Sequence, residues 1–214
     1  MRKWTLLTLL ICISLFSVAM VVARILYSGR YTFINLNWNL FLAWLPILFA
    51  ALAVRWRKRP FLALTLAFLW LLFLPNAPYL VTDLIYLRTR APVPFLYDMI
   101  MLLSFAALGL FLGLVSLRMM QGLVCSRFGA AAGWIFVMSV LAVSGLGVYI
   151  GRVLRWNSWD LFVRPLPLLN DVRNELSEPQ TIVISGIMAV MMIGAYVLLT
   201  TALDLSGGLK QQTY

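Results

Sequence analysis

Two arginines three residues apart, Arg152 and Arg155, have the spacing that points most directly to binding chemistry. On a helix this spacing makes two side chains near neighbours, and two guanidinium groups can hold a phosphate or a carboxylate through bidentate hydrogen bonds. We predict that the polar residues flanking them bind the same substrate: Tyr149, Asn157 and Asp160. Two other interpretations stay open, namely ion pairs with aspartates, a common state of charges in membranes, and snorkelling beside the neighbouring tryptophans.

Two aspartates, Asp83 and Asp98, are the candidate acid–base groups. If both project into one cavity, their pKa values would separate and the pair could share acid–base work. Asn76 and Tyr79 precede Asp83 at helical spacing, so they share its face and could orient a substrate. The competing interpretation places this face in headgroups or water, and makes Asp98 a helix-start residue that complements the helix dipole.

The sequence lacks the residues of several common catalytic sites. It has no histidine, which excludes histidine-dependent protease, hydrolase and zinc chemistry. The two cysteines, Cys12 and Cys125, lie in or beside apolar segments and indicate neither a disulfide framework nor a metal site. We therefore predict no metal and no cofactor, and the sequence does not decide whether the protein is an enzyme.

The composition indicates what surrounds these residues. The chain of 214 residues is 63% hydrophobic and 11% charged, with a mean hydropathy of +0.96. Soluble domains average about a quarter charged residues, and a soluble fold with so few would expose large apolar patches. The solvent for most of this protein is therefore predicted to be lipid. A net charge of +10 then reports basic cytoplasmic loops rather than nucleic-acid binding.

Six segments are long and apolar enough to position the site as membrane spans, since a helix needs about 20 mostly apolar residues to cross a bilayer. They lie near residues 4–27, 37–54, 61–81, 98–117, 130–151 and 181–203. The longest connection, near 152–180, is too short for a soluble domain, so residues 1–214 are expected to form one polytopic transmembrane domain of all-α class. The first segment exceeds the ~7–15-residue apolar core of a signal peptide, so we expect it to stay uncleaved.

The distribution of charge predicts the orientation of these spans. With six spans both termini lie on one side, which carries nine lysines and arginines and one acidic residue, whereas the other side carries eight arginines and six acidic residues. Cytoplasmic loops are rich in Lys and Arg, and residues 55–59 read Arg-Trp-Arg-Lys-Arg. Both termini are therefore predicted to be cytoplasmic, and nearly all candidate site residues fall on the outer side.

Two segments are expected to depart from regular spanning helices. Pro75 and Pro78 should kink or break the third span, and irregular backbone at that depth often lines a cavity. Asn76 is expected to cap the helix that restarts there. Beyond the fifth span, an amphipathic helix is predicted to start near Pro167 and to lie on the outer leaflet. Its apolar stripe comprises Leu168, Leu169, Val172 and Leu176.

Contacts between helices are predicted at amide and small residues. Asn39, near the membrane boundary, is expected to hydrogen-bond another helix rather than a ligand. Pairs of glycines four residues apart allow helices to approach closely and could support a homo-oligomer or a hetero-oligomer. These pairs are Gly109 with Gly113, Gly129 with Gly133, and Gly147 with Gly151.

Four phrases occur in order along the chain. They are Asn-Leu-Phe-Leu-Ala-Trp-Leu-Pro at residues 39–46, Phe-Leu-Pro-Asn-Ala-Pro-Tyr-Leu-Val-Thr-Asp-Leu at 73–84, Tyr-Asp at 97–98, and Gly-Val-Tyr-Ile-Gly-Arg-Val-Leu-Arg-Trp-Asn-Ser-Trp-Asp at 147–160. Together they resemble a polytopic bacterial membrane family catalogued as a domain of unknown function, DUF1361, from about residue 35 to the last span. The resemblance implies a protein of the bacterial cytoplasmic membrane, and it implies no particular activity, substrate or cofactor.

Three functions are compatible with these patterns. The favoured one is binding or processing of an anionic substrate, such as a lipid-linked one, at the outer leaflet, with Arg152 and Arg155 holding phosphate and an aspartate serving as base. A small transporter would use the broken third span as its site, but the chain shows no internal repeat. A non-catalytic assembly or sensor protein would dock a partner through its glycine faces and its outer helix.

Overall fold

The computed structural model describes the backbone of residues 3–211 and the side chains of residues 5–204. Within these residues every regular element is helical, and the one β-type pairing is a bridge between Arg90 and Val93. The predicted all-α class is therefore confirmed. Three terminal basic residues that were counted in predicting the orientation have side chains outside the described residues: Arg2, Lys3 and Lys210.

The helices are α1 (Lys3–Ser28), α2 (Asn35–Arg55), α3 (Pro60–Phe73), α4 (Asn76–Thr82), the 3-10 helix η1 (Asp83–Tyr86), α5 (Phe95–Arg152), α6 (Asp160–Val163), α7 (Pro165–Glu175) and α8 (Pro179–Gln211).

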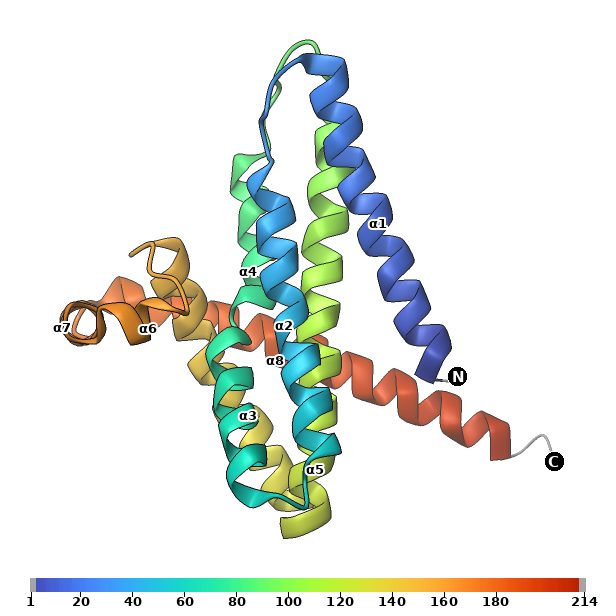
Figure 1. Cartoon of the computed structure of the whole chain (residues 1–214), viewed down its shortest axis with the longest axis vertical. Coiled ribbons are helices and arrows are strands. Elements are labelled where there is room, and N and C mark those ends of the chain that lie inside the picture. The colour runs from blue at the N-terminus through green and yellow to red at the C-terminus, as the bar shows by residue number, and fades with distance from the viewer. Residues whose placement is uncertain (1–2, 212–214) are drawn as a thin grey trace. The chain divides into compact units, whose positions relative to one another are not determined.

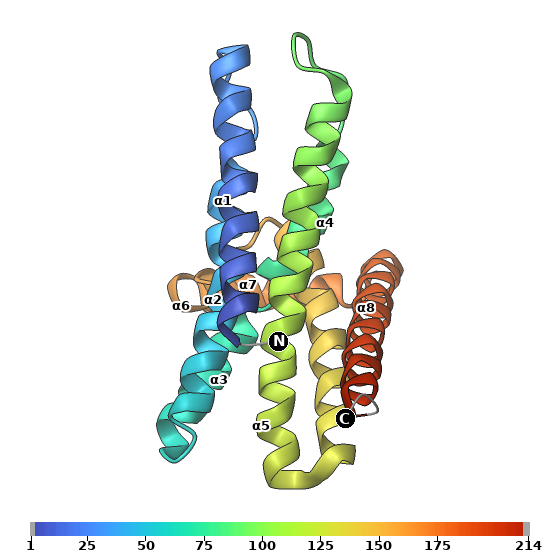
Figure 2. The same ribbon diagram turned by 90° about the vertical axis from the view of Figure 1, so that its right-hand side faces the viewer.

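Five helical segments of the described chain are long and apolar enough to cross a membrane. They are Thr5–Ser28, Asn35–Arg55, Pro60–Tyr86, Phe95–Arg152 and Pro179–Asp204. The fourth of them, α5, has 58 residues and is interrupted at Gly129, which has φ 85° and ψ 170°. Glycine adopts this conformation readily because it has no Cβ. The chain reverses direction there (Figure 2), so α5 consists of two helical stretches, and the predicted fourth and fifth spans fall on one stretch each.

The chain divides into two compact units, Met1–Met120 and Gln121–Tyr214. In the first unit α2 lies beside α3 and α4, and the first stretch of α5 lies beside α4 and α1 (Figure 1). One apolar core joins these helices, with Val21, Leu40, Leu80 and Phe105 as members from α1, α2, α4 and α5. The first unit therefore brings together helices that are distant in the sequence.

A glycine sets the closest approach in the first unit. A Cβ placed on Gly109 of α5 would lie 2.5 Å from the backbone oxygen of Ala77 in α4, and one on Gly113 would lie 3.1 Å from the Cβ of Ala77. Real side chains essentially never come as close as the first of these distances. The pair of small residues predicted to allow close helix packing is thus used between α4 and α5 of the same chain.

The third predicted span bends between α3 and α4, where the backbone keeps right-handed helical dihedrals. Pro78 has no N–H to give to the Leu74 carbonyl, which instead accepts the N–H of Ala77 at 3.1 Å. The Phe73 carbonyl, which Ala77 would otherwise bond, accepts the side-chain amide of Asn76 at 3.0 Å. The structure places Pro75, rather than Asn76, at the N-cap position of α4, and the side-chain amide of Asn76 serves the end of α3.

In the second unit α8 packs against α5 through an enclosed tyrosine. Tyr196 of α8 has an exposed fraction of 0%, and its hydroxyl donates to Oε1 of Gln121 at 2.6 Å. Its ring meets Trp134 edge-on with the centroids 6.1 Å apart. Both the apolar and the polar parts of this side chain therefore have partners, as burial of a phenol requires.

The connection between α5 and α8 contains the short helices α6 and α7. The predicted amphipathic helix corresponds to α7, none of whose residues is buried. Leu166 and Leu169 are exposed by 72% and 55%, whereas Leu168 and Val172 are half-buried. The leucines of α7 thus divide between a face that packs on the second unit and a face that stays uncovered within it.

Candidate functional site

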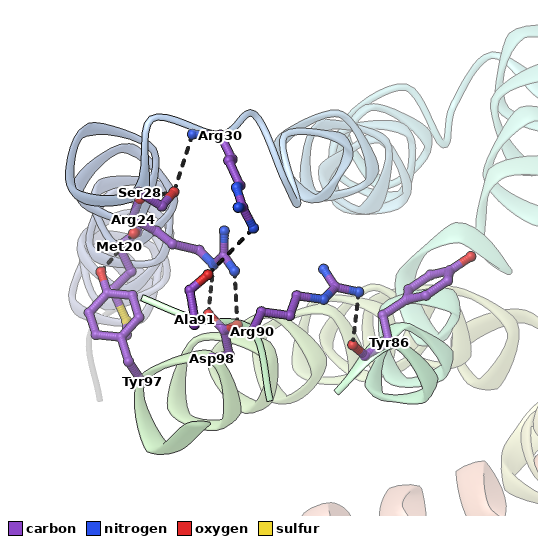
Figure 3. Close-up of polar contacts among 9 residues, drawn as sticks. All are labelled: Met20, Arg24, Ser28, Arg30, Tyr86, Arg90, Ala91, Tyr97 and Asp98. Carbon is purple, nitrogen blue, oxygen red and sulfur yellow. Dashed lines mark hydrogen bonds and ion pairs between the residues drawn. The ribbon is translucent and has the colours of Figure 1, made fainter. Parts of the chain in front are cut away.

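Near the Ser28 end of α1, Arg24 and Asp98 form a buried ion pair (Figure 3). Nε and Nη2 of Arg24 donate to the two carboxylate oxygens of Asp98 at 2.7 and 3.0 Å, and each side chain is 2% exposed. The same two helices are joined by the hydroxyl of Tyr97, which donates to the Met20 carbonyl at 2.7 Å. The pair links α1 to the start of α5 and neutralises a charge that is costly in an apolar environment.

Arg24 is not among the predicted site residues, although the sequence carries a signal for it. It is the one charged residue within the predicted first span, 4–27, and a charge inside a span indicates a partner or a function. In the comparison of charges on the two sides of the membrane, Arg24 is included only as one of the eight arginines of the predicted outer side. Its partner Asp98 lies 74 residues further along the chain, so no local spacing could identify the pair.

Two more arginines lie near this ion pair (Figure 3). Arg30 donates to the Ala91 carbonyl and Arg90 donates to the Tyr86 carbonyl, both at 3.4 Å. Neither of these acceptors is charged, so the hydrogen bonds do not neutralise the guanidinium groups. We call Arg24, Arg30 and Arg90 the outer arginine cluster, after the side of the membrane on which the charge distribution predicts them. Three positive groups thus gather near the carboxylate of Asp98.

An aromatic ring and the neighbouring charges shape the environment of Arg90. The guanidinium carbons of Arg24 and Arg90 lie 4.9 and 4.6 Å from the ring centre of Phe33, within the range of cation–π attraction. Burial lowers the pKa of Arg90, and the positive charges of Arg88 and Arg24 lower it further, whereas Asp98 raises it. Besides burial, two positive charges and one negative charge thus act on Arg90.

The other candidate carboxylate, Asp83, has a partner on a different helix. Its exposed fraction is 4%, and it accepts a hydrogen bond from the side-chain amide of Asn39 in α2 at 3.1 Å. The predicted interhelical hydrogen bond of Asn39 is confirmed. Asn76 and Tyr79 are half-buried on α4, the helix that leads directly into Asp83. The two carboxylates are thus each engaged by another helix, Asp98 by α1 and Asp83 by α2.

Arg152 and Arg155 of the second unit do not lie on one helix. Arg152 is the last residue of α5, and Arg155 lies beyond it in left-handed backbone with φ 60°. This conformation turns the chain so that the N–H of Trp156 reaches the Ile150 carbonyl at 3.4 Å. The expected helical neighbour relation is therefore wrong, because the helix ends between the two arginines. Arg152 is half-buried and Arg155 is exposed.

Asp160 closes the turn that follows these arginines. Its exposed fraction is 4%, and its Oδ2 accepts the backbone N–H of Asn157 at 2.8 Å and the side-chain amide of Asn157 at 3.3 Å. Arg164 lies 3.5 Å from its other oxygen. The backbone hydrogen bond is the main cause that lowers the pKa of Asp160, and the Asn157 amide and Arg164 lower it further against the opposing effect of burial. Asn157 and Asp160 thus lie together in this turn.

Tyr149 is buried and points to an acidic residue that the sequence did not single out. Its hydroxyl donates to Oε2 of Glu175 at 3.1 Å, and Thr181 donates to the same oxygen at 3.0 Å. These bonds join the ends of α5, α7 and α8. The pattern that could have indicated Glu175 is its place at the end of an otherwise solvent-facing helix, where an acidic side chain does not complement the helix dipole.

The predicted site residues therefore form two groups, one in each unit. The first unit holds Asn76, Tyr79, Asp83 and Asp98, and the second holds Tyr149, Arg152, Arg155, Asn157 and Asp160. Among the described residues, no group of three or more His, Cys, Asp or Glu side chains could hold a metal ion. The chemistry that both groups offer is ion pairing and hydrogen bonding by arginine, amide and carboxylate groups.

The fold and these polar groups define the class of the protein, since helices able to cross a membrane several times carry buried charged and amide side chains in their midst. It is a helical, multi-pass membrane protein. Residues 38–194 match the family described as "Protein of unknown function (DUF1361)", and the chain belongs to that family. No curated protein and no solved structure matches the chain.

Proposed function

We propose that the protein crosses the bacterial cytoplasmic membrane six times, with both termini in the cytoplasm, and binds an anionic substrate, such as a lipid-linked one, at its outer face. Six crossings are supported by the break at Gly129, because it divides a helix too long for a single crossing into two stretches. The orientation is supported by the basic loop at residues 55–59 and by the excess of basic residues on its side.

The observation that carries this proposal is the outer arginine cluster. Basic residues are normally concentrated on the cytoplasmic side, yet Arg24, Arg30 and Arg90 gather at the opposite end of α1 from the N-terminus. Asp98 compensates one of the three positive charges by its bidentate contact with Arg24. An anion is the ligand that such an excess of guanidinium groups favours, since charge-assisted hydrogen bonds to phosphate or carboxylate are among the strongest in proteins.

The remaining site residues take roles that fit this ligand. In the second unit, Arg152 and Arg155 would offer cationic contacts to an anion, and the polar residues around them would orient it there: Tyr149, Asn157 and Asp160. If the substrate is processed rather than only bound, Asp83 is the acid–base group that we favour, with Asn76 and Tyr79 orienting the substrate. We favour it because Asp98 serves as the counter-ion of Arg24.

The bilayer itself is the principal partner in this proposal. The exposed leucines of α7, Leu166 and Leu169, would rest in the outer leaflet, where an amphipathic helix gains from burial of its apolar face. Contacts between copies or with another membrane protein would use the face of Gly147 and Gly151. No role in nucleic-acid binding is proposed.

Native mass spectrometry of the full chain in a mild detergent tests the proposal. Phosphatidylglycerol and phosphatidylcholine are offered together, and the anionic lipid is expected to be retained in preference. The double variant Arg30→Gln/Arg90→Gln should lose this preference because it removes two outer positive charges. The double variant Arg57→Gln/Lys58→Gln is the matched control, since it removes the same charge from the basic loop between α2 and α3.

The control separates the outer face from the inner one. Retention of the preference in the Arg57→Gln/Lys58→Gln variant supports an outer site. Equal retention of both lipids by the unaltered chain, or loss of the preference only in the inner-loop variant, would contradict the proposal. A further arm concerns the second unit, where Arg152→Gln should weaken anionic-lipid binding without lowering the amount of protein in the membrane.

A further inference from the structure

Two buried nitrogen atoms of the outer arginine cluster lack an acceptor. Nη1 of Arg24 and Nε of Arg90 are buried and have no hydrogen-bond partner among the residues that the structure describes. A buried N–H without an acceptor costs free energy, and more so when the group is charged. An oxygen atom from outside the chain would satisfy these two donors.

The contacts that these side chains make within the chain define which buried nitrogen atoms are left for a ligand. Arg24 uses Nε and Nη2 for Asp98, so its unpaired Nη1 lies on the side of the guanidinium away from that carboxylate. Arg90 uses Nη2 for the Tyr86 carbonyl at 3.4 Å, and Figure 3 shows its side chain extended along the end of the unit. Each guanidinium thus retains one buried donor after its contacts within the chain are made.

Phe33 contacts both guanidinium groups through its ring. Its ring centre lies 4.9 Å from the guanidinium carbon of Arg24 and 4.6 Å from that of Arg90. Phe33 itself has φ 69°, a left-handed conformation that is costly for a bulky residue. The Phe33 ring, between α1 and α2, is therefore a common contact of the two guanidinium groups.

The chemistry of a ligand that would suit these donors follows from this arrangement. A carboxylate prefers the parallel fork of a single guanidinium, and Asp98 already occupies that fork on Arg24. The two unpaired donors belong to different guanidinium groups, so the ligand must present oxygens in more than one direction. A tetrahedral phosphate group does so, and it also brings the negative charge that this end of the first unit lacks.

We propose that Arg24 and Arg90 form a phosphate-binding subsite beside Phe33, in which phosphate oxygens accept hydrogen bonds from Nη1 of Arg24 and Nε of Arg90. This inference rests on the proposed function and gives its anion a chemical class. The phosphate comes from a lipid headgroup or from a free phosphate group, and both would make the same two contacts.

The test uses the full chain, delipidated in a maltoside detergent. One arm titrates inorganic phosphate against chloride at matched ionic strength. The other arm titrates phosphatidylglycerol against dioleoylglycerol, which lacks the phosphate. Binding is followed by the rise in thermal unfolding midpoint and by native mass spectrometry. A rise with phosphatidylglycerol alone identifies a headgroup, and a rise with inorganic phosphate identifies a free phosphate group.

Arg90→Lys is the decisive variant, because it keeps the charge and removes the Nε donor of a residue that is outside the ion pair. We expect it to weaken phosphate binding about tenfold or more. Arg24→Lys should weaken binding similarly and reports on Nη1. Arg88→Lys is the matched control, since Arg88 is exposed two residues away in the same loop and should bind as the unaltered chain does.

The outcomes separate this inference from the proposed function. If the unaltered chain binds phosphatidylglycerol and Arg90→Lys binds it equally well, the subsite is wrong and the anion binds elsewhere on the protein. If Arg88→Lys weakens binding as much as Arg90→Lys, the two arginines of this loop contribute equally to binding. The subsite is then again wrong. If the unaltered chain binds neither probe, the proposed function fails as well.

Discussion

The guanidinium group of Arg24 lies inside an apolar helix, and its charge is tolerated there because both oxygens of Asp98 accept its hydrogen bonds. Removing one partner of a buried ion pair is far more damaging than replacing both, because a lone buried charge keeps its desolvation cost and loses its compensation. The contact also joins α1 to α5 across a long separation in sequence, so its loss affects packing of the first unit and not only the two side chains.

Asp98→Asn is therefore expected to lower the free energy of unfolding by about 3–5 kcal/mol. The double variant Arg24→Met/Asp98→Leu should recover most of this loss, since apolar residues of similar size can replace a buried pair. The thermal unfolding midpoint in detergent and the amount of protein in the membrane report the effect. Asp171→Asn, an exposed position, is the control and should stay near the unaltered value. Equal stability of Asp98→Asn and the unaltered chain would show that the pair does not hold α1 against α5.

Residue roles that depend on local pattern could be predicted from the sequence, and those that depend on a distant partner could not. The interhelical hydrogen bond of Asn39 follows from the cost of an amide near the membrane boundary, and the structure supplies Asp83 as its acceptor. The ion pair of Asp98 was missed because its partner Arg24 lies on another helix. The spacing of Arg152 and Arg155 led to the wrong prediction that they are neighbours on one helix, because helical periodicity does not show at which residue a helix ends.

The close contact between α4 and α5 depends on a residue without a side chain. Gly109→Ala is expected to destabilise the protein by about 1–3 kcal/mol, because overpacking forces neighbouring atoms to shift. Here the nearest obstacle is the backbone oxygen of Ala77, which cannot rotate away as a side chain can. The thermal unfolding midpoint measures the effect.

The same helix offers a matched control for this substitution. A Cβ on Gly122 of α5 would meet nothing within 4 Å, so Gly122→Ala should stabilise the helix by about 0.5–1 kcal/mol, because alanine loses less conformational entropy than glycine. Opposite signs for the two substitutions would identify the contact with α4 as the cause. Destabilisation of equal size at both positions would contradict it.

The turn between α5 and α6 should respond to acid through Asp160. The pKa of Asp160 is lowered chiefly by the backbone N–H of Asn157, so the folded chain favours the ionised carboxylate. This contribution to stability is complete at neutral pH, above the ordinary aspartate value of about 3.9, and it is lost as the pH falls through the lower folded value. Thermal unfolding measured between about pH 7 and pH 3 should show this loss.

Two variants assign that pH dependence. Asp160→Asn should be less stable at neutral pH and should lose less stability on acidification than the unaltered chain. Asp171→Asn removes a different carboxylate of the second unit, which accepts the indole N–H of Trp156 at 3.0 Å, and should leave the acid-dependent loss in place. An unchanged acid profile in Asp160→Asn would contradict the assignment.

The lengths of the elements were more predictable than their ends. Apolar length identifies the membrane-crossing segments, because a helix in lipid must satisfy its own backbone hydrogen bonds. The ends depend on single residues whose conformation the pattern does not specify, such as Gly129 in α5 and Arg155 beyond it. At the bend between α3 and α4, two prolines indicate an irregularity correctly, but the exchange of hydrogen bonds that assigns Asn76 to the end of α3 is a matter of geometry.

At the scale of the whole molecule, the number of crossings decides which side of the membrane each polar group faces. As one straight helix α5 would be about 87 Å long, at about 1.5 Å per residue, whereas the hydrocarbon core of a bilayer is about 30 Å thick. The reversal at Gly129 resolves this mismatch if each stretch crosses the membrane once. In that case the loop before α5 and the turn after it would face the same side of the membrane, as the proposed topology requires.

Labelling of single cysteines with a membrane-impermeant thiol reagent tests this topology in intact cells. With Cys12 and Cys125 replaced by serine, cysteines are introduced at exposed positions of four connections: Lys58→Cys, Thr89→Cys, Ser126→Cys and Asn157→Cys. Six crossings with cytoplasmic termini predict labelling at positions 89 and 157 only, and labelling of all four after the cells are opened. The pair formed by positions 89 and 157 is the critical comparison, because a single crossing by α5 would place them on opposite sides. Labelling of one without the other would therefore remove the shared outer face on which the proposed function depends.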